Sequence, residues 1–154
     1  MSKIYDVIVL GAGPAGLAAG LYAGRSRLSV LIIEKGQDGG QIAITDEIEN
    51  YPGQIVEGES GPSLIARMTE QAAKFGAERV SDTIKEVELN GDVKVLKSEK
   101  AEYQGRNVII ATGAIRMEGT SREYAPIEFP AVADFQVTNA LVEATKKLGF
   151  PLHT

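Results

Sequence analysis

Six residues near the N-terminus, Gly11–Gly16, have the types and spacing of a loop that binds phosphate groups. They read G-A-G-P-A-G, directly after an apolar run and directly before a helical pattern. In that context Gly11 permits a tight turn, Gly13 lets the backbone approach a pyrophosphate, and Gly16 brings helix and strand together. We expect the main-chain N–H groups of this loop to converge on a diphosphate, with hydrogen bonds worth about 1.5–3 kcal/mol each.

A carboxylate, Glu34, stands at the end of the next apolar run, residues 28–34. In this position a carboxylate accepts hydrogen bonds from both ribose hydroxyls of a nucleotide and repels a 2′-phosphate. Together with the glycine loop it predicts a dinucleotide site. Two plainer alternatives stay open: the glycines only permit close packing of helix and strand, and Glu34 is only a solvated residue at a strand end.

The elements that position these residues form a β-α-β unit. Residues 4–10 and 28–34 are near-continuous apolar runs, as expected of buried parallel strands, and residues 14–25 between them have helical spacing. The crossover in such a unit is almost always right-handed. The connection that follows, residues 36–61, is long and rich in glycine and acidic residues, so we expect it to be functional or disordered.

Residues 60–76 predict an amphipathic helix with Ser60 as its N-cap and Gly76 as its stop. Its apolar face is expected to comprise Leu64, Ile65, Met68 and either Ala72 or Ala73.

The remaining residues predict a hairpin, one more strand and a final helix. Residues 78–104 alternate in short segments around Asn90-Gly91, a strong hairpin signal, and predict a small antiparallel meander. Residues 107–111 predict another buried strand. Beyond loop material, Asp134 caps a helix expected over residues 135–148.

The composition excludes several classes of function. The chain of 154 residues has a net charge of −5 and no cysteine, so it holds no disulfide, thiolate metal site or dithiol redox centre. The acidic balance argues against nucleic acid as a partner, and no apolar run approaches the ~20 residues of a membrane span. Since the first strand leaves no room for a signal peptide, we expect a cytoplasmic protein. The single histidine, His153, is expected to be a tail residue, and we expect no catalytic or metal-binding residues.

Residues 4–113 resemble the FAD-binding half of bacterial thioredoxin reductases and the related ferredoxin–NADP reductases. The motifs that carry the resemblance are YDVIVLGAGPAGLAAGLYAGR, GGQI at 39–42, ENYPG at 49–53, GP at 61–62 and NVIIATGA at 107–114. The resemblance implies FAD as the cofactor, bound by an α/β, Rossmann-like three-layer (ββα) domain with a parallel sheet and a small antiparallel β-meander.

The same resemblance assigns roles residue by residue. It implies contacts with the pyrophosphate from Gly13, Pro14 and Ala15, with the ribose from Glu34, with the flavin side from Gly40, Gln41 and Asn50, and with adenine from the backbone around Ile84. Ala111, Thr112 and Gly113 would close over the cofactor. The full expected set of cofactor-binding residues adds Gly11, Gly16 and Lys35.

Other features of that family are missing from the sequence, namely a second Rossmann unit for NADPH, its Cys-x-x-Cys, and a C-terminal Gly-Asp segment that completes the FAD domain. Residues 108–149 instead resemble an interior stretch of bacterial uridine phosphorylases, and the two resemblances overlap at 108–114. We interpret the chain as a recombined or engineered chimera that forms a single domain, 1–154. In it, residues 114–154 supply a loop and a C-terminal capping helix.

The leading hypothesis is an FAD-binding module without a complete catalytic cycle, for which weak or substoichiometric FAD is an expected outcome. The alternative is a structural chimera that folds without cofactor and has no activity. Phosphorolysis of uridine ranks last, because the stretch lacks the phosphate- and base-binding motifs of that family. FAD is the expected partner, and an uncovered sheet edge would permit a homodimer.

Overall fold

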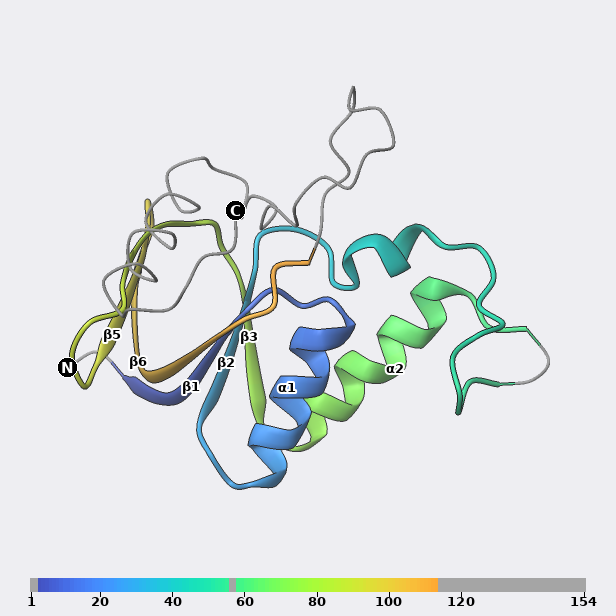
Figure 1. The fold of residues 1–154 in the computed structure, drawn as a ribbon, viewed down its shortest axis with the longest axis horizontal. Coiled ribbons are helices and arrows are strands. Elements are labelled where there is room, and N and C mark those ends of the chain that lie inside the picture. Colours follow the sequence, from blue (N-terminus) through green and yellow to red (C-terminus); the bar gives the residue numbers. More distant parts are fainter. Residues whose placement is uncertain (1–2, 56–57, 114–154) are drawn as a thin grey trace, which may run out of the picture.

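The computed structural model describes residues 3–55 and 58–113, which form one mixed sheet with two helices on one of its faces (Figure 1). The sheet has six strands in the order β3-β2-β1-β6-β5-β4. From the N-terminus the elements are β1 (Ile4–Leu10), α1 (Pro14–Arg25), β2 (Val30–Glu34), the 3₁₀ helix η1 (Gly40–Ile44), α2 (Gly61–Lys74), β3 (Ala77–Ser81), β4 (Ile84–Glu88), β5 (Lys94–Ser98) and β6 (Glu102–Ile110).

Parallel and antiparallel pairing meet in this sheet. β1 pairs in parallel with β2 and with β6, and β2 pairs in parallel with β3. The β4–β5 hairpin and the β5–β6 pair are antiparallel. β6 is therefore shared, because its first residues lie beside β5, where Tyr103 faces Leu96, while Gln104 to Ile110 lie beside β1.

The core has one cluster on each face of the parallel strands, because successive side chains of a strand point to opposite faces. Val7 and Val9 of β1 belong to the cluster under α1 and α2. Ile8 belongs to the cluster on the other face, which the hairpin covers with Ile84 and Leu96. Helices, parallel strands and hairpin thus form the three layers expected from the sequence.

The two helices expected within the described residues are confirmed. α1 spans the expected residues 14–25. α2 begins after Ser60, whose side chain accepts a hydrogen bond of 3.2 Å from the Ser63 N–H, and Gly76 follows its end with φ 86°. The apolar face of α2 includes Ala72, which is 2% exposed, whereas Ala73 is exposed.

The segment after α2 differs from the antiparallel meander predicted over residues 78–104, and for residues 77–81 that prediction was wrong. Residues 77–81 form a parallel strand beside β2, and only the residues from Ile84 onward belong to the antiparallel part. An edge strand buries little, so Glu78 and Arg79 are exposed and the segment lacks the apolar run typical of a parallel strand.

Two strand boundaries also differ from the sequence expectation. β2 begins at Val30 rather than at residue 28, because Leu28 lies in the exposed turn after α1, where it is 41% exposed. β6 begins at Glu102 rather than at 107, since its polar first residues pair with β5. The strand at 107–110 is less buried than expected, and Ile110 is 43% exposed.

The long connection after β2 is ordered over much of its described length. It contains η1 and an isolated antiparallel bridge between Ile48 and Glu59. The Glu59 side chain is fully buried and bound by Arg67 of α2, with N–O distances of 2.5 and 2.9 Å. This bidentate pair fastens the connection to the start of α2.

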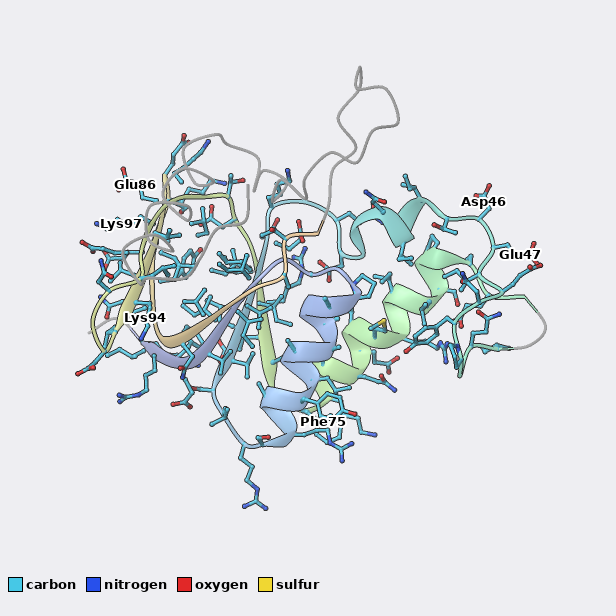
Figure 2. All side chains as sticks on the ribbon, in the orientation of Figure 1. Asp46, Glu47, Phe75, Glu86, Lys94 and Lys97 are labelled. Carbon is cyan, nitrogen blue, oxygen red and sulfur yellow. The ribbon has the colours of Figure 1, made fainter. Side chains whose placement is uncertain are left out.

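The β4–β5 hairpin carries charged side chains, among them Glu86, Lys94 and Lys97 (Figure 2). β3 and β4 form the two edges of the described sheet. Charges on an edge strand oppose its pairing with another chain. The homodimer expected through a sheet edge stays a prediction.

Several expectations fall on residues that the structure does not describe. The loop at 115–130, the Asp134 cap, the capping helix at 135–148 and the tail residue His153 all lie outside the described residues. Within 3–55 and 58–113, neither helix is long and apolar enough to span a membrane.

Candidate dinucleotide site

A cavity of about 520 Å³ opens where the C-terminal ends of β1, β2 and β6 meet the start of α1. The expected site residues that line it are Gly11, Gly13, Pro14, Glu34, Lys35, Gly40, Gln41, Ile84, Ala111, Thr112 and Gly113. The lining also includes Leu10, Ile33, Gly39, Ile42 and Asp82, which were not among the expected cofactor-binding residues. Three expected residues, Ala15, Gly16 and Asn50, are not part of the lining.

The first and third glycines of the loop are required by packing within the protein. Gly11 has φ 101°, and a Cβ built on it would lie 2.3 Å from the carbonyl oxygen of Ala111. A Cβ on Gly16 would lie 1.9 Å from the carbonyl oxygen of Gly11. The tight turn and the close approach of helix and strand expected at these positions are therefore confirmed.

Packing within the protein does not explain the middle glycine, Gly13. Gly13 has φ −72°, which any residue adopts, and a Cβ built on it would meet none of the described atoms within 4 Å. Gly13 lines the cavity, and the position that a side chain would occupy there is open space among the described atoms. This is the arrangement expected where a ligand rather than the protein needs the room.

At the start of α1, beside the cavity, main-chain N–H groups have no hydrogen-bond partner among the described residues. The first intrahelical bond runs from the Leu17 N–H to the Gly13 carbonyl oxygen at 2.9 Å, so the N–H groups of Ala15 and Gly16 precede the helical pattern. Gly13 is the N-cap residue, and in the described part of the chain no side-chain hydrogen bond caps this helix start. These N–H groups also lie at the positive end of the helix dipole, which favours an anion there.

Not all amides of the loop are available, which corrects the sequence expectation. The Gly11 N–H donates to the Ile33 carbonyl oxygen at 2.8 Å. The Ala12 N–H donates to Glu34 Oε2, also at 2.8 Å. The first two N–H groups of the motif therefore hold the loop to β2, and the later ones remain for a ligand.

Glu34 is more than a solvated residue at a strand end. It is half-buried, Oε2 accepts the Ala12 N–H, and Oε1 accepts the Gly36 N–H at 3.1 Å. A carboxylate has about four acceptor positions, so two contacts leave capacity for further donors such as hydroxyl groups. Glu34 thus shapes the loop and faces the cavity at the same time.

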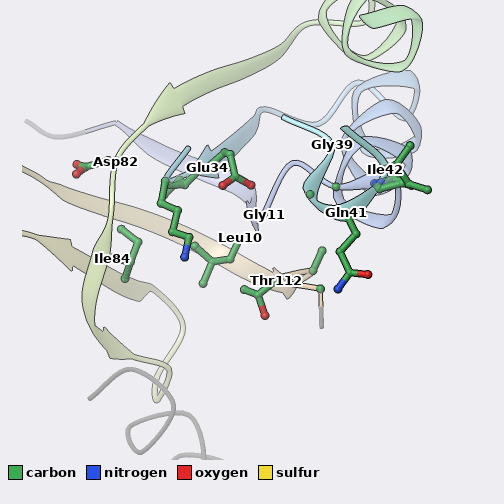
Figure 3. A pocket seen from close by; sticks show the side chains of 16 residues that line it. Leu10, Gly11, Glu34, Gly39, Gln41, Ile42, Asp82, Ile84 and Thr112 are labelled. Atoms are coloured by element: carbon green, nitrogen blue, oxygen red, sulfur yellow. The ribbon is translucent and has the colours of Figure 1, made fainter. Parts of the chain in front are cut away.

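The cavity has two distinct ends (Figure 3). Asp82 and Ile84 lie at one end, beside the crossover from β3 to β4, and Gln41 and Ile42 of η1 lie at the other. Glu34, Leu10 and Gly11 lie between them. An elongated ligand with its charged centre at the glycine loop would reach both ends.

The η1 end of the cavity is fixed by backbone contacts. The Gly39 N–H donates to the Ala12 carbonyl oxygen at 2.8 Å, and the Gly61 N–H donates to the Thr45 carbonyl oxygen at 2.9 Å. A Cβ on Gly61 would lie 1.7 Å from the carbonyl oxygen of Ile42, so η1 rests directly on the start of α2. Asn50, by contrast, is exposed in the connection beyond η1.

The other end contains a buried carboxylate that the sequence analysis missed. Asp82 is 9% exposed and accepts hydrogen bonds from Ser98 Oγ at 2.6 Å and from the Tyr103 hydroxyl at 2.7 Å. Burial raises the pKa of Asp82, but hydrogen bonds, chiefly from Ser98 and Tyr103, hold it below its usual range. Its partners lie on β5 and β6, so no local sequence signal marks it.

The described residues contain no group of three or more His, Cys, Asp or Glu side chains that could hold a metal ion. The polar side chains in the described lining of the cavity belong to Glu34, Lys35, Gln41, Asp82 and Thr112.

Comparison with known proteins places this geometry in a family. The family model described as pyridine nucleotide-disulphide oxidoreductase matches residues 5–148. The chain belongs to this family. Its members use FAD, which confirms at the level of the family the cofactor expected from the sequence.

Curated relatives give a closer likeness over part of their length. The chain is 54% identical over 114 residues to a thioredoxin reductase of Peptoclostridium acidaminophilum, covering 74% of this chain and 36% of that protein. It is 53% identical over 112 residues to the thioredoxin reductase of Bacillus subtilis, covering 73% of this chain and 35% of that one. This chain thus spans about a third of the length of these relatives.

Solved structures agree with the fold. The crystal structure of thioredoxin reductase from Streptococcus pyogenes superposes with a TM-score of 0.71 at 46% identity, covering 77% of this chain and 39% of that one. Thioredoxin reductase of Lactococcus lactis gives a TM-score of 0.70 at 40% identity, over 74% of this chain and 37% of that one. The Rossmann-like FAD-binding domain expected from the sequence is therefore confirmed.

Proposed function

We propose that this chain is an FAD-binding module in which the cavity holds the cofactor along its length. The diphosphate would lie at the start of α1, against the N–H groups of Ala15 and Gly16. The adenosine would extend toward Glu34 and Ile84, and the flavin would extend toward η1. Lys35, Gly40, Gln41 and the segment Ala111–Gly113 would complete the walls.

The observation that carries this proposal is the open space at Gly13. Helix packing and backbone geometry explain Gly11 and Gly16, but the described protein atoms leave the side-chain position of Gly13 empty. A diphosphate approaching the uncapped helix start would need that room. The Glu34 carboxylate beside it suits ribose hydroxyls and repels a 2′-phosphate, which favours FAD over a cofactor phosphorylated there.

The residues of this chain would bind and orient the cofactor, and the redox chemistry would be that of the flavin itself. A bound flavin accepts and returns electrons as a hydride or singly. The 154 residues contain no cysteine, so they supply no dithiol to exchange electrons with a disulfide. We therefore propose cofactor binding, and not disulfide reduction, as the function of these residues.

The test is titration of the purified protein with FAD, followed by flavin absorbance and fluorescence. We expect saturable binding of FAD by the natural chain. Gly13→Ala should weaken binding by about tenfold or more, because a methyl group would intrude on the diphosphate. Gly36→Ala is the matched control: a Cβ there also meets no described atom within 4 Å, but Gly36 does not line the cavity.

Equal affinity in the natural chain, the Gly13 variant and the Gly36 variant would contradict the proposed binding mode. No flavin absorbance at all, even after incubation with FAD, would contradict the function.

A second candidate is a fold that is complete without cofactor. Its support is the Glu34 carboxylate, which bonds the Ala12 N–H and so closes the loop with protein groups alone. Under this hypothesis the chain has no activity and its preparations are colourless. The FAD titration separates the two candidates.

Three statements about the whole chain remain proposals on the sequence alone. These are a single domain over 1–154, a chimeric origin with a uridine phosphorylase-like stretch at 108–149, and a cytoplasmic location. The family match extends to residue 148, whereas the two relatives described above match over 114 and 112 residues. Turnover of uridine and phosphate above background would be needed to support an inherited phosphorylase activity.

A further inference from the structure

The buried carboxylate of Asp82 lies where two binding elements of the cavity meet. It stands between the end of β3 and the start of β4, and it lines the cavity together with Ile84, which is 1% exposed. Its N–H donates to the Glu34 carbonyl oxygen at 3.1 Å. The backbone of Asp82 therefore joins the strand end that carries Glu34 to the strand start that carries Ile84.

The side chain of Asp82 adds contacts to two further strands. Oδ2 accepts a hydrogen bond of 2.6 Å from the hydroxyl of Ser98, the last residue of β5. It accepts a second one of 2.7 Å from the hydroxyl of Tyr103, which belongs to β6. Oδ1 accepts the Thr83 N–H at 2.8 Å. One carboxylate thus fixes the β3–β4 crossover to the β5–β6 turn.

Its partners are themselves held in place. Ser98 Oγ accepts the N–H groups of Lys100 and Ala101 at 3.0 and 2.9 Å, which orients the hydroxyl toward Asp82. Hydrogen bonds to an ionised carboxylate are stronger than those between neutral groups. The cluster of Asp82, Ser98 and Tyr103 is therefore a rigid support and not a loose surface contact.

We propose that Asp82 is a positioning residue for the adenosine half of the ligand. It holds the start of β4, and with it the backbone and side chain of Ile84, at a fixed place relative to Glu34. This inference rests on the proposed function, since it assigns adenosine to this end of the cavity. Asp82 acts through its neighbours, and its own acceptor sites are largely occupied.

The chain offers a matched carboxylate for comparison. Asp6 also binds a serine, accepting the Ser29 N–H at 2.8 Å and the Ser29 hydroxyl at 2.7 Å. Asp6 does not line the cavity. A purely stabilising role predicts that neither Asp6 nor Asp82 affects the ligand affinity of the folded protein, whereas a positioning role predicts a loss of affinity at Asp82 alone.

The experiment measures the affinity for ADP, the probe that carries adenosine and diphosphate without flavin, by calorimetry. Asp82→Asn keeps an acceptor for the Thr83 N–H but presents an amide NH₂ to Ser98 and Tyr103. We expect it to weaken ADP binding by about tenfold. Tyr103→Phe removes a single donor and should weaken binding by about threefold. Asp6→Asn should leave the affinity unchanged.

The titrations are run at a temperature at which unfolding curves show every variant folded, so that a loss of stability does not appear as a loss of affinity. The double variant Asp82→Asn/Tyr103→Phe should bind no more weakly than Asp82→Asn, because Tyr103 acts through Asp82. Should Asp82→Asn fail to fold, Tyr103→Phe and Ser98→Ala against Asp6→Asn give the same comparison.

Each outcome has a distinct meaning. ADP binding by Asp82→Asn as tight as in the natural chain overturns the positioning role and leaves the proposed function standing. Equal losses in Asp82→Asn and Asp6→Asn overturn it as well. A natural chain that binds neither ADP nor FAD overturns the proposed function itself.

Discussion

At the glycine loop the cavity is walled by main chain, whereas at the β3–β4 crossover it is walled by side chains. The loop is held by a hydrogen bond from the Gly11 N–H to the Ile33 carbonyl oxygen. The carbonyl oxygen of Gly11 lies so close to Gly16 that no Cβ fits there. The crossover is held by one carboxylate and two hydroxyls from separate strands. The first wall has no room for a Cβ at Gly11 or Gly16, and the second depends on the hydrogen bonds of a single carboxylate.

Gly16→Ala should produce the largest effect and tests the main-chain wall. The new methyl would lie 1.9 Å from the Gly11 carbonyl oxygen, and neither backbone segment can move freely. We expect a loss of about 3 kcal/mol or more in the free energy of unfolding, measured in urea.

The matched control on the same helix is Gly20→Ala, whose methyl would meet the flexible end of Ile32 at 2.6 Å. It should cost about 1 kcal/mol or less, because a side chain can rotate away. Equal costs for the two variants would mean that the close approach of loop and helix is not rigid.

Glu34→Gln changes a residue between the two walls and should lower the free energy of unfolding by an intermediate amount. A glutamine keeps one acceptor and loses the other, so either the Ala12 or the Gly36 N–H is left without its partner. We expect a loss of about 1–2 kcal/mol in unfolding free energy, together with weaker FAD binding. An unchanged urea midpoint would show that the carboxylate does not hold the loop.

Acid should weaken the side-chain wall at the β3–β4 crossover. Hydrogen bonds hold the pKa of Asp82 below its ordinary value of 3.8, so the unfolded chain binds a proton more readily than the folded one. The stabilisation by Asp82 is therefore complete above this value and is lost as the pH falls through the lower folded pKa. In urea titrations Asp82→Asn should show a shallower acid dependence than the natural chain, and identical slopes would contradict this.

The smallest effect on stability is expected at high pH, where the Tyr103 hydroxyl loses its proton. Burial and the hydrogen bond to Asp82 raise the pKa of Tyr103 from 10.0 to about 12. Its stabilising effect is complete below pH 10.0 and is lost as the pH rises through the folded value. Phenolate absorbance should show a late-titrating tyrosine that is absent in Tyr103→Phe and titrates earlier in Asp82→Asn.

The contrast between the walls also explains what the sequence could predict. Gly11, Gly13 and Gly16 act within one turn of chain, so their spacing alone predicted the loop. Glu34 was predicted because a carboxylate at the end of the second strand is diagnostic after such a glycine loop. The apolar runs that predicted β1 and β2, and the residues Ser60 and Gly76 that predicted the ends of α2, were likewise local signals.

Asp82 escaped prediction because its partners come from elsewhere in the chain. Ser98 and Tyr103 are common polar residues, and nothing in their spacing shows that the fold brings them to one point. β3 escaped for a related reason: at an edge of the sheet, its exposed Glu78 and Arg79 replace the apolar run that marks a central strand. Asn50, assigned to the flavin side by resemblance, lies outside the cavity lining.

The double pairing of β6 has a consequence for the order of folding. Its contacts with β5 are local and close quickly, whereas the pairing of Gln104 with Ile4 joins the two extremes of the described chain. The hairpin can therefore form early, while the pocket exists only once β6 has docked on β1. A ligand that binds only after β6 has docked should slow unfolding far more than it accelerates refolding. Its bound state would therefore keep β6 paired with β1.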